Sequence, residues 1–425
     1  MAHGYNIDKR KLNKRNHIID LFRKHRILSK ARAREESGYS MDTIISVFNG
    51  LLEDGLIVPT RGEQKQKGRK AVFYRLEDGG HTYLGVTFNR SGIFSVLVGL
   101  SGAVLLDHVS RIDSGSTHET FTGTFQDHLD RVMGDARAKS IEVRAASVAV
   151  PGDLDETTGV LRSYTFMPRI SNLDMYRVVE KPLTCVDTVV EQNVTGMGGY
   201  FLHDEELAER YRRILFVSVH SGAASGLVYD GTIVTGHGEF GHIQVSDEDR
   251  KCVCGRRGCL DLYFSHQGFL QLYREAIALS GGRDSSPEAE PDDLMETLRD
   301  AFTGGNQNIV DALRRRLGYF ASALLDVVNV TAPEAVVCTG SLFRAYPDPH
   351  GELLSVIREQ FEDTGLITHF SNTNLIYRDV GPEIAAVGGA YRLIDRDWGY
   401  IREERRSKRR GETPAGRGRS VRGNI

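Results

Sequence analysis

Two short segments in the second half of the chain decide the fold. Residues 238–242 read Gly-Glu-Phe-Gly-His, and residues 252–261 read Cys-Val-Cys-Gly-Arg-Arg-Gly-Cys-Leu-Asp. Three of the five cysteines fall in the second segment, and the glycines between them let the backbone turn tightly enough for three thiolates to converge. With one imidazole they would form the closed tetrahedral set of a structural Zn²⁺ site. The predicted ligands are His242, Cys252, Cys254 and Cys259.

Other interpretations of these cysteines stay open. A reduced cysteine-rich loop or an oxidised pair also fits the cluster, although three cysteines around two glycines in a cytosolic chain favour zinc. His237 and His266 lie nearby in the sequence, so spacing alone does not fix the fourth ligand. The other two cysteines, Cys185 and Cys338, stand in apolar strand-like segments and are predicted to be buried.

The composition is that of a folded protein with several domains. The 425 residues suffice for two or three domains, and 40% of them are hydrophobic and 26% charged. Five cysteines are too few for a disulfide-stapled secreted scaffold. There is no signal-like N-terminus and no apolar run of about 18 residues. We therefore expect a cytoplasmic protein with no membrane partner.

The formal net charge of −3 hides three regions of different sign. Residues 1–76 hold 17 Lys and Arg against 8 Asp and Glu, which gives +9. Residues 402–425 hold 9 against 3, which gives +6, and residues 77–401 keep the remaining −18. A basic head on an acidic body indicates that the head meets a polyanion. The Arg-, Gly- and Ser-rich tail is predicted to be disordered, and either adds nonspecific DNA affinity or aids solubility.

Residues 1–76 predict a winged helix-turn-helix with a wing and a basic linker. The third helix has one apolar face and an exposed N-terminal end, where a recognition helix contacts base edges in the major groove. The expected elements are helices over 13–24 and 30–36, a third helix capped by Ser40, and strands at 56–58 and 72–74.

The DNA contacts are predicted on the second and third helices and on the basic hairpin. They are Arg32, Arg34, Ser40, Met41, Asp42, Thr43, Ser46, Lys65, Lys67, Arg69 and Lys70. A small helical domain with a charged surface is the alternative for the head as a whole. The hairpin segment would either lie along a narrow minor groove or serve as a flexible, solvated linker.

The body alternates strands and helices in two successive rounds, which predicts a duplicated α/β architecture with lobes at 77–210 and 211–401. Two such lobes leave a cleft suited to a small ligand. Strands are expected at 83–88, 93–100, 103–109, 145–150, 186–190, 214–219, 226–229, 232–234 and 335–338. Helices are expected at 119–138, from 195, and at 267–278, 310–328 and 384–394.

The motif of residues 238–261 resembles the signature of the ROK family (repressors, open reading frames and kinases). Further pieces that are similar to the family are Val150-Pro151-Gly152, Asn172-Leu173, Asp230-Gly231 and Gly388-Gly389-Ala390, so the resemblance spans roughly residues 13–396. It implies a body with the duplicated actin/hexokinase-like (ribonuclease H-like) fold of sugar kinases. In the repressors of the family this body carries an N-terminal winged helix.

Several positions depart from the kinase pattern. The family's Asp-x-Gly-Gly-Thr phosphate loop is replaced by Thr-Phe-Asn-Arg-Ser at 87–91, and the second phosphate loop reads His-Ser-Gly-Ala-Ala at 220–224. A third glycine-rich turn keeps only Gly340. Asn193 stands where the catalytic Asp is expected, and an amide cannot accept the proton of a sugar hydroxyl. The resemblance therefore implies a sensor and no enzyme.

The same resemblance implies a pocket for a sugar or sugar-phosphate effector. The implied contacts are Asn172, Gln192, Asn193, Glu239, His242 and Asp261. Glu239 and His242 have an equally structural interpretation, as a capping carboxylate and a plain zinc ligand. Gln192 and Asn193 would alternatively mark a pocket that no longer suits free monosaccharides.

We therefore expect a sequence-specific DNA-binding regulator, a repressor of carbohydrate genes, that binds a palindromic double-stranded operator as a homodimer or homotetramer. The rival interpretation is an active sugar kinase with a DNA-binding appendage. A third is a metal-dependent interaction protein without ligand control.

Overall fold

The computed structural model describes residues 2–61, 72–90, 92–234, 238–279, 291–361 and 373–398. The chain divides into two compact units. The smaller unit comprises residues 1–78, 100–102 and 394–425, and the larger comprises residues 79–99 and 103–393. No helix within the described ranges is both long and apolar enough to cross a membrane.

The N-terminal head is a winged helix-turn-helix. Its three-stranded sheet has the order β1-β3-β2 and packs with three helices around a core that includes Phe22, Phe48 and Leu51. The tip of the predicted wing lies outside the described residues. The elements are α1 (Ala2–His25), β1 (Leu28–Ser29), α2 (Lys30–Ser37), α3 (Met41–Glu53), β2 (Ile57–Thr60) and β3 (Phe73–Leu76).

Local capping explains where these helices begin and end. The Ser29 hydroxyl accepts from Arg32 N and starts α2, which ends at the left-handed Gly38 with φ 71°. The Ser40 hydroxyl accepts from Thr43 N at the start of α3, which confirms the predicted cap. The predicted start of α1 at residue 13 is wrong, because the polar residues before it continue the helix without an apolar period that would signal it.

The larger unit contains two five-stranded sheets of the same topology. In each, three antiparallel strands are followed by two parallel ones, in the orders β11-β7-β4-β5-β6 and β14-β13-β12-β15-β16. The predicted duplicated α/β fold is therefore confirmed. The strands are β4 (Thr82–Phe88), β5 (Gly92–Gly99), β6 (Val104–Arg111), β7 (Val143–Val150), β11 (Asp187–Gln192), β12 (Arg213–Val219), β13 (Ala223–Tyr229), β14 (Thr232–Val234), β15 (Ala335–Thr339) and β16 (Asn374–Arg378).

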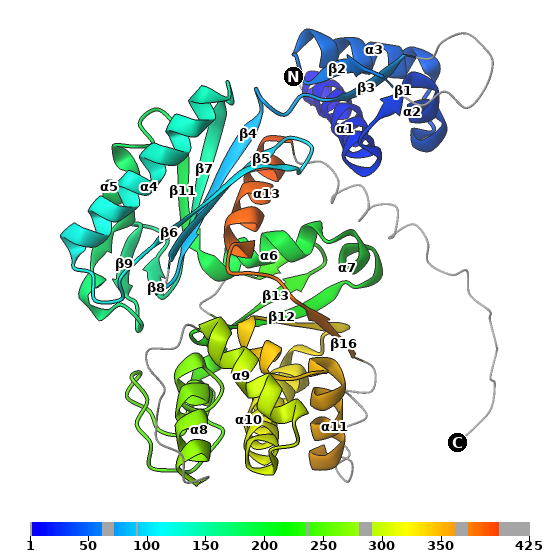
Figure 1. Cartoon of the computed structure of the whole chain (residues 1–425). Helices are drawn as coiled ribbons and strands as arrows, with labels where there is room; N and C mark the ends of the chain where they lie inside the picture. The colour runs from blue at the N-terminus through cyan, green and yellow to red at the C-terminus, as the bar shows by residue number, and fades with distance from the viewer. Residues whose placement is uncertain are drawn as a thin grey trace, which may run out of the picture. The chain divides into compact units, whose positions relative to one another are not determined.

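Helices form layers on both sides of these sheets (Figure 1). Helices α4 and α5 cover one face of the first sheet, α6 and α13 lie between the two sheets, and α8 to α11 cover the far face of the second. The helices are α4 (His118–Ala138), α5 (Met175–Glu180), α6 (Asn193–His203), α7 (Glu205–Arg210), α8 (His266–Leu279), α9 (Pro291–Thr303), α10 (Gln307–Thr331), α11 (Pro349–Phe361) and α13 (Ile384–Trp398).

Several elements are absent from the sequence-based expectations. Strand β16 is only five residues long, too short to show a periodic pattern. Helices α9 and α11 each begin with a proline, a start signal that could have identified them. A small sheet β10-β9-β8 is also new, built from β8 (Asp153–Asp155), β9 (Val160–Ser163) and β10 (Leu173–Asp174). The predicted burial of Cys338 is confirmed, whereas Cys185 is exposed at the left-handed residue that precedes β11.

The layer between the sheets is held by backbone contact at glycines. A Cβ on Gly196 of α6 would lie 2.4 Å from the Ala385 carbonyl oxygen of α13, and a Cβ on Gly388 would lie 1.9 Å from the Gly196 oxygen. A Cβ on Gly85 of β4 would lie 1.8 Å from the Ala386 oxygen. Because all these neighbours are backbone atoms, no rotamer change can make room for a side chain.

We predict that Gly388→Ala lowers the free energy of unfolding by about 3 kcal/mol, because α6 and α13 must separate to admit the methyl group. Gly134→Ala in α4 is the matched control, since a Cβ there meets nothing within 4 Å. The control is expected to be neutral or to stabilise by about 0.5–1 kcal/mol, as alanine favours helix over glycine. Urea unfolding of both variants measures this, and equal stabilities would contradict the backbone contact.

Candidate functional site

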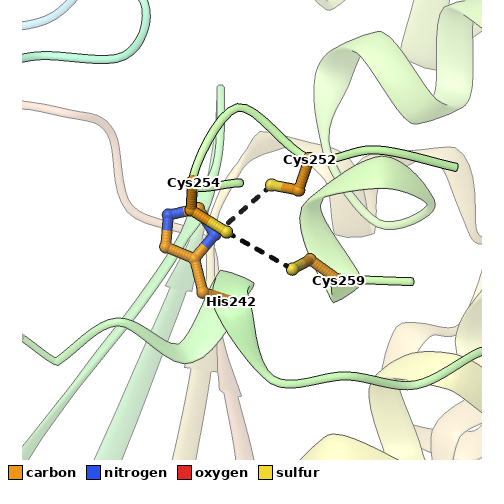
Figure 2. A group of neighbouring side chains, drawn as sticks. All are labelled: His242, Cys252, Cys254 and Cys259. Atoms are coloured by element: carbon orange, nitrogen blue, oxygen red, sulfur yellow. Dashed lines mark hydrogen bonds between the residues drawn. The ribbon is translucent and has the colours of Figure 1, made fainter. Parts of the chain in front are cut away.

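Four candidate metal ligands converge at one loop of the larger unit (Figure 2). The loop runs between two short 3₁₀ helices, η2 (Phe240–His242) and η3 (Leu260–Leu262). His242 Nδ1 lies 3.6 Å from Cys252 Sγ, and Cys254 Sγ lies 3.6 Å from Cys259 Sγ. One ligand atom from each of the four residues fits within 4.8 Å of all the others. The structure thus brings together the predicted set His242, Cys252, Cys254 and Cys259.

Glycines and backbone bonds fold this loop. Gly255 and Gly258 both adopt left-handed φ values, 87° and 65°, and a Cβ on Gly258 would lie 1.8 Å from the Ser246 carbonyl oxygen. Cys252 N donates to Arg256 O at 2.8 Å, which closes the turn that carries Cys254. The tight turns predicted from the two glycines are therefore present.

The donor set fits a tetrahedral zinc ion. Zn–S bonds of about 2.3 Å and Zn–N bonds of about 2.0 Å place two sulfurs about 3.8 Å apart and a sulfur and a nitrogen about 3.5 Å apart. The two 3.6 Å distances match these edges. Burial, together with the neighbouring thiols, raises the pKa of Cys259 to about 12. Three thiols so close together cannot all ionise without a cation to balance their charge, and Zn²⁺ supplies that charge.

The two ring nitrogens of His242 face different groups. Nδ1 points to the cysteine cluster, 3.6 Å from Cys252 Sγ, while Nε2 lies 3.7 Å from a carboxylate oxygen of Glu239. A metal at Nδ1 leaves Nε2 as a donor with a fixed orientation. The imidazole therefore connects the metal cluster to a second set of polar side chains.

Asp261 belongs to this second set. Its Oδ1 accepts from Ala223 N at 2.9 Å, and its carboxylate lies against Gly222 and Gly241, where added Cβ atoms would come within 3.0 and 2.1 Å of it. Burial raises the pKa of the Asp261 carboxyl to about 6, opposed by the Ala223 N–H and by His242. Glu239, His242 and Asp261 thus gather beside the metal cluster.

The remaining candidate effector residues lie elsewhere or are engaged. Gln192 is buried and its side chain donates to Leu154 O at 3.2 Å. Asn193 is half-buried at the first turn of α6. Asn172 is exposed with a left-handed φ of 58°, and among the described contacts none joins it to Asp261. The structure therefore groups three of the six predicted contacts.

Arg90 and Phe166 at this site were missed by the sequence analysis, and His266 was considered there only as an alternative metal ligand. Arg90 Nη2 lies 2.8 Å from His266 Nδ1, a bond between residues 176 positions apart. Burial and the Arg90 charge lower the pKa of His266 to about 4, so its neutral ring accepts this bond. Phe166 approaches Gly222, where a Cβ would lie 3.0 Å from its ring. No local pattern marks such long-range pairs.

Both loops at the positions of the kinase phosphate loops are closed by side chains. Asn89 accepts from Gly92 N at 3.0 Å, which forms a tight turn between β4 and β5, and Phe88 is buried in the core. On the other sheet, His220 Nδ1 accepts from Ser341 N at 3.3 Å and lies 3.3 Å from Ser341 Oγ.

A cavity of about 260 Å³ lies between the metal loop and α8. It shares Asp261 with the polar set, so it adjoins the candidate effector site. It is lined by Arg250, Asp261, Leu262, Gln267, Gly268, Leu270, Gln271 and Arg274.

The head presents part of the predicted DNA surface. Arg32, Arg34, Ser40, Asp42 and Ser46 are exposed, whereas Met41 and Thr43 are half-buried. The Arg32 guanidinium bonds Glu36 and His25, and the Ser40 hydroxyl is engaged with Thr43 in the cap of α3. Lys65, Lys67, Arg69 and Lys70 lie outside the described residues, as does the tail from 402.

Similarity to known proteins agrees with this architecture. A family model described as "ROK family" matches residues 83–395. The xylose repressor of Bacillus subtilis (strain 168) is 20% identical over 372 residues, 87% of this chain and 91% of that protein. The DNA-binding transcriptional dual regulator NagC of Escherichia coli (strain K12) is 24% identical over 334 residues, 75% of this chain and 78% of that protein.

The fold has solved counterparts. The crystal structure of a ROK family transcriptional regulator, a homologue of the Escherichia coli MLC protein, has a TM-score of 0.69 and 22% identity, and the match covers 92% of this chain and 97% of that chain. At this identity the similarity supports the fold alone. Since the family model spans well over half of the sequence, this chain belongs to the ROK family.

Proposed function

We propose that this protein is a transcriptional regulator, a repressor of carbohydrate genes, whose winged helix binds a specific operator and whose ROK body binds a sugar or sugar-phosphate effector. The observation that carries the proposal is the presence of a winged helix and a ROK body in one chain, most of which is similar to repressors. Such a protein would act in the cytoplasm beside its DNA.

The charge distribution supports DNA binding by the head. Residues 1–76 carry +9 and the body −18, so phosphates attract the head and repel the body. On α3, Asp42 and Ser46 are one helical turn apart and exposed, in the position from which recognition helices contact base edges. A palindromic operator would require a homodimer or homotetramer with two-fold symmetry.

Effector binding is supported by the polar set beside the metal loop. Glu239 and Asp261 supply carboxylate acceptors for hydroxyl groups, and His242 supplies a donor at Nε2. Asn193, at the first turn of α6, can exchange hydrogen bonds with a hydroxyl but cannot remove its proton. With the loops closed at Asn89 and at His220, this supports binding of a carbohydrate without phosphoryl transfer.

A zinc ion in the loop would serve structure and orientation. It would be held by His242, Cys252, Cys254 and Cys259, and supplies the charge that keeps the thiols ionised. By fixing the loop it would also fix Asp261, which follows Cys259 by two residues.

The head predicts a specific DNA phenotype. Ser46→Glu places a negative charge on the exposed face of α3, so we expect affinity for a duplex from the protein's own upstream region to fall about tenfold or more. Ser114→Glu adds the same charge to an exposed position of the body and should leave affinity unchanged. Fluorescence anisotropy over a salt series measures both. Wild-type binding that neither depends on salt nor prefers the upstream duplex over an unrelated one would refute the proposal.

The polar set predicts a thermal-shift phenotype. A panel of xylose, N-acetylglucosamine, glucose and their phosphates should include a compound that raises Tm, since a ligand at one hundred times its Kd adds about 2.7 kcal/mol. Glu239→Gln should abolish the rise, and Glu296→Gln, an exposed control on α9, should keep it.

Two outcomes of the same assay favour the rival functions. ATP-dependent phosphorylation of the stabilising sugar, lost on substitution of Asn193, would identify a kinase. Absence of any Tm rise across the panel would favour a metal-dependent interaction protein without ligand control.

Metal content provides an independent test of the zinc site. The purified chain should contain about one zinc ion, and Cys259→Ser should lower both zinc content and Tm, because the folded loop gains its stability from the metal. Cys185→Ser is the control, since Cys185 is exposed and outside the cluster. Elemental analysis with thermal melting decides, and equal zinc content in both variants would exclude this ligand set.

A further inference from the structure

Helix α13 is one uninterrupted helix that contributes to both units of the protein. Residues 384–393 belong to the larger unit, and residues 394–398 belong to the smaller one. A helix transmits rotation and translation along its length because each turn is hydrogen-bonded to the next. A force applied at one end of α13 therefore reaches the other through a continuous backbone.

At its body end, α13 is fastened to the start of α6. The backbones of the two helices touch at Gly196 and Gly388, where no side chain could intervene. Arg392 of α13 forms an ion pair with Glu191, a buried residue that also accepts from Ser147 Oγ at 2.8 Å. Glu191 immediately precedes Gln192 and Asn193, two of the candidate effector contacts. Because these contacts are direct, a displacement at the end of β11 would also displace α13.

At its other end, α13 contributes to contacts within the head unit. The Trp398 ring lies 5.6 Å from the Arg15 guanidinium carbon, in cation–π geometry. Arg15 belongs to α1 and pairs with Asp54 at 2.5 Å. Asp54 is the C-cap of α3, the helix that carries the predicted base contacts. The same α13 is thus two side-chain contacts away from the recognition helix.

We propose that α13 couples the start of α6, where the candidate effector contacts Gln192 and Asn193 stand, to the recognition helix, with Glu191 and Arg392 as positioning residues at one end and Trp398 and Arg15 at the other. This inference rests on the proposed regulatory function. An effector that moves the start of α6 moves α13, and Trp398 then alters the support that Arg15 gives to α3. By linkage, operator binding at α3 must act back on the start of α6 with the same coupling free energy.

A purely structural role for the Glu191–Arg392 pair would have different consequences from the proposed coupling role. A buried ion pair stabilises the fold little more than apolar residues of similar size would. Removing one partner lowers the stability, because the other charge is left buried and unpaired. If the pair is only structural, breaking it lowers Tm and leaves the head unchanged. If the pair couples the two ends of α13, breaking it changes the surroundings of Trp398 and the DNA affinity, even relative to a variant of equal stability.

The protein supplies its own probe for this distinction, because Trp398 is the single tryptophan of the chain. We would compare Glu191→Gln and Arg392→Met with Val190→Ala in the full-length, zinc-loaded protein. Val190 is buried beside Glu191 on β11 but packs in the core under α4 and α5, so its truncation destabilises the same strand without touching α13. The readouts are Trp398 emission and affinity for the upstream duplex.

We expect Glu191→Gln and Arg392→Met to shift Trp398 emission and to change DNA affinity by about threefold or more relative to Val190→Ala, within the range that coupling networks show. If both match Val190→Ala in emission and affinity, α13 is not the coupling element. Should the wild type fail to bind its upstream DNA, the proposed function fails, while the emission spectra still decide whether Glu191 and Arg392 control the environment of Trp398. Because Arg392 is partly exposed, Arg392→Met keeps the test valid if Glu191→Gln does not fold.

Discussion

The contact of α6 with α13 is the constraint on which the larger unit depends. Two sheets of identical topology face a shared pair of helices, and those helices approach so closely that Gly196 and Gly388 meet backbone to backbone. Gly85 of the first sheet meets α13 in the same way. Because packed backbones cannot deform gradually, the helix pair moves as one body or not at all. This rigidity holds Asn193, the first residue of α6, and the end of β11 in a fixed position.

The metal loop, residues 242–261, would form a second rigid surface, beside the other sheet. A metal held by the cluster would fix the Nδ1 edge of His242 and leave the Nε2 edge beside Glu239. Asp261 is tied by the Ala223 amide to the start of β13. Under the proposed function, an effector would bind between two rigidly held surfaces, one positioned by the α6–α13 pair and one by the metal loop. The affinity for a ligand that contacts both would depend on the distance between them.

Local chemistry allowed much of this arrangement to be predicted. The Cys-Val-Cys and Gly-Cys spacing predicted the three cysteines of the cluster, because glycine turns act over a few residues, whereas spacing alone did not choose His242 over the neighbouring histidines. The Ser40 cap and the apolar face likewise predicted helix α3. Pairs brought together by tertiary folding were out of reach: neither Arg90 with His266 nor Glu191 with Arg392 leaves a periodic or motif-like trace. The exposure of Cys185 was missed because apolar neighbours say little about a left-handed residue at a strand end.

His220 and Ser341 join the ends of two adjacent strands through side chain and backbone together. His220→Ala would leave the Ser341 amide without this acceptor, so the two strand ends would be joined by the sheet alone. The first sheet has a counterpart in the turn at Asn89, where a side chain also bridges the ends of two neighbouring strands. The duplication of the body therefore extends beyond the two sheets to the turns at their strand ends.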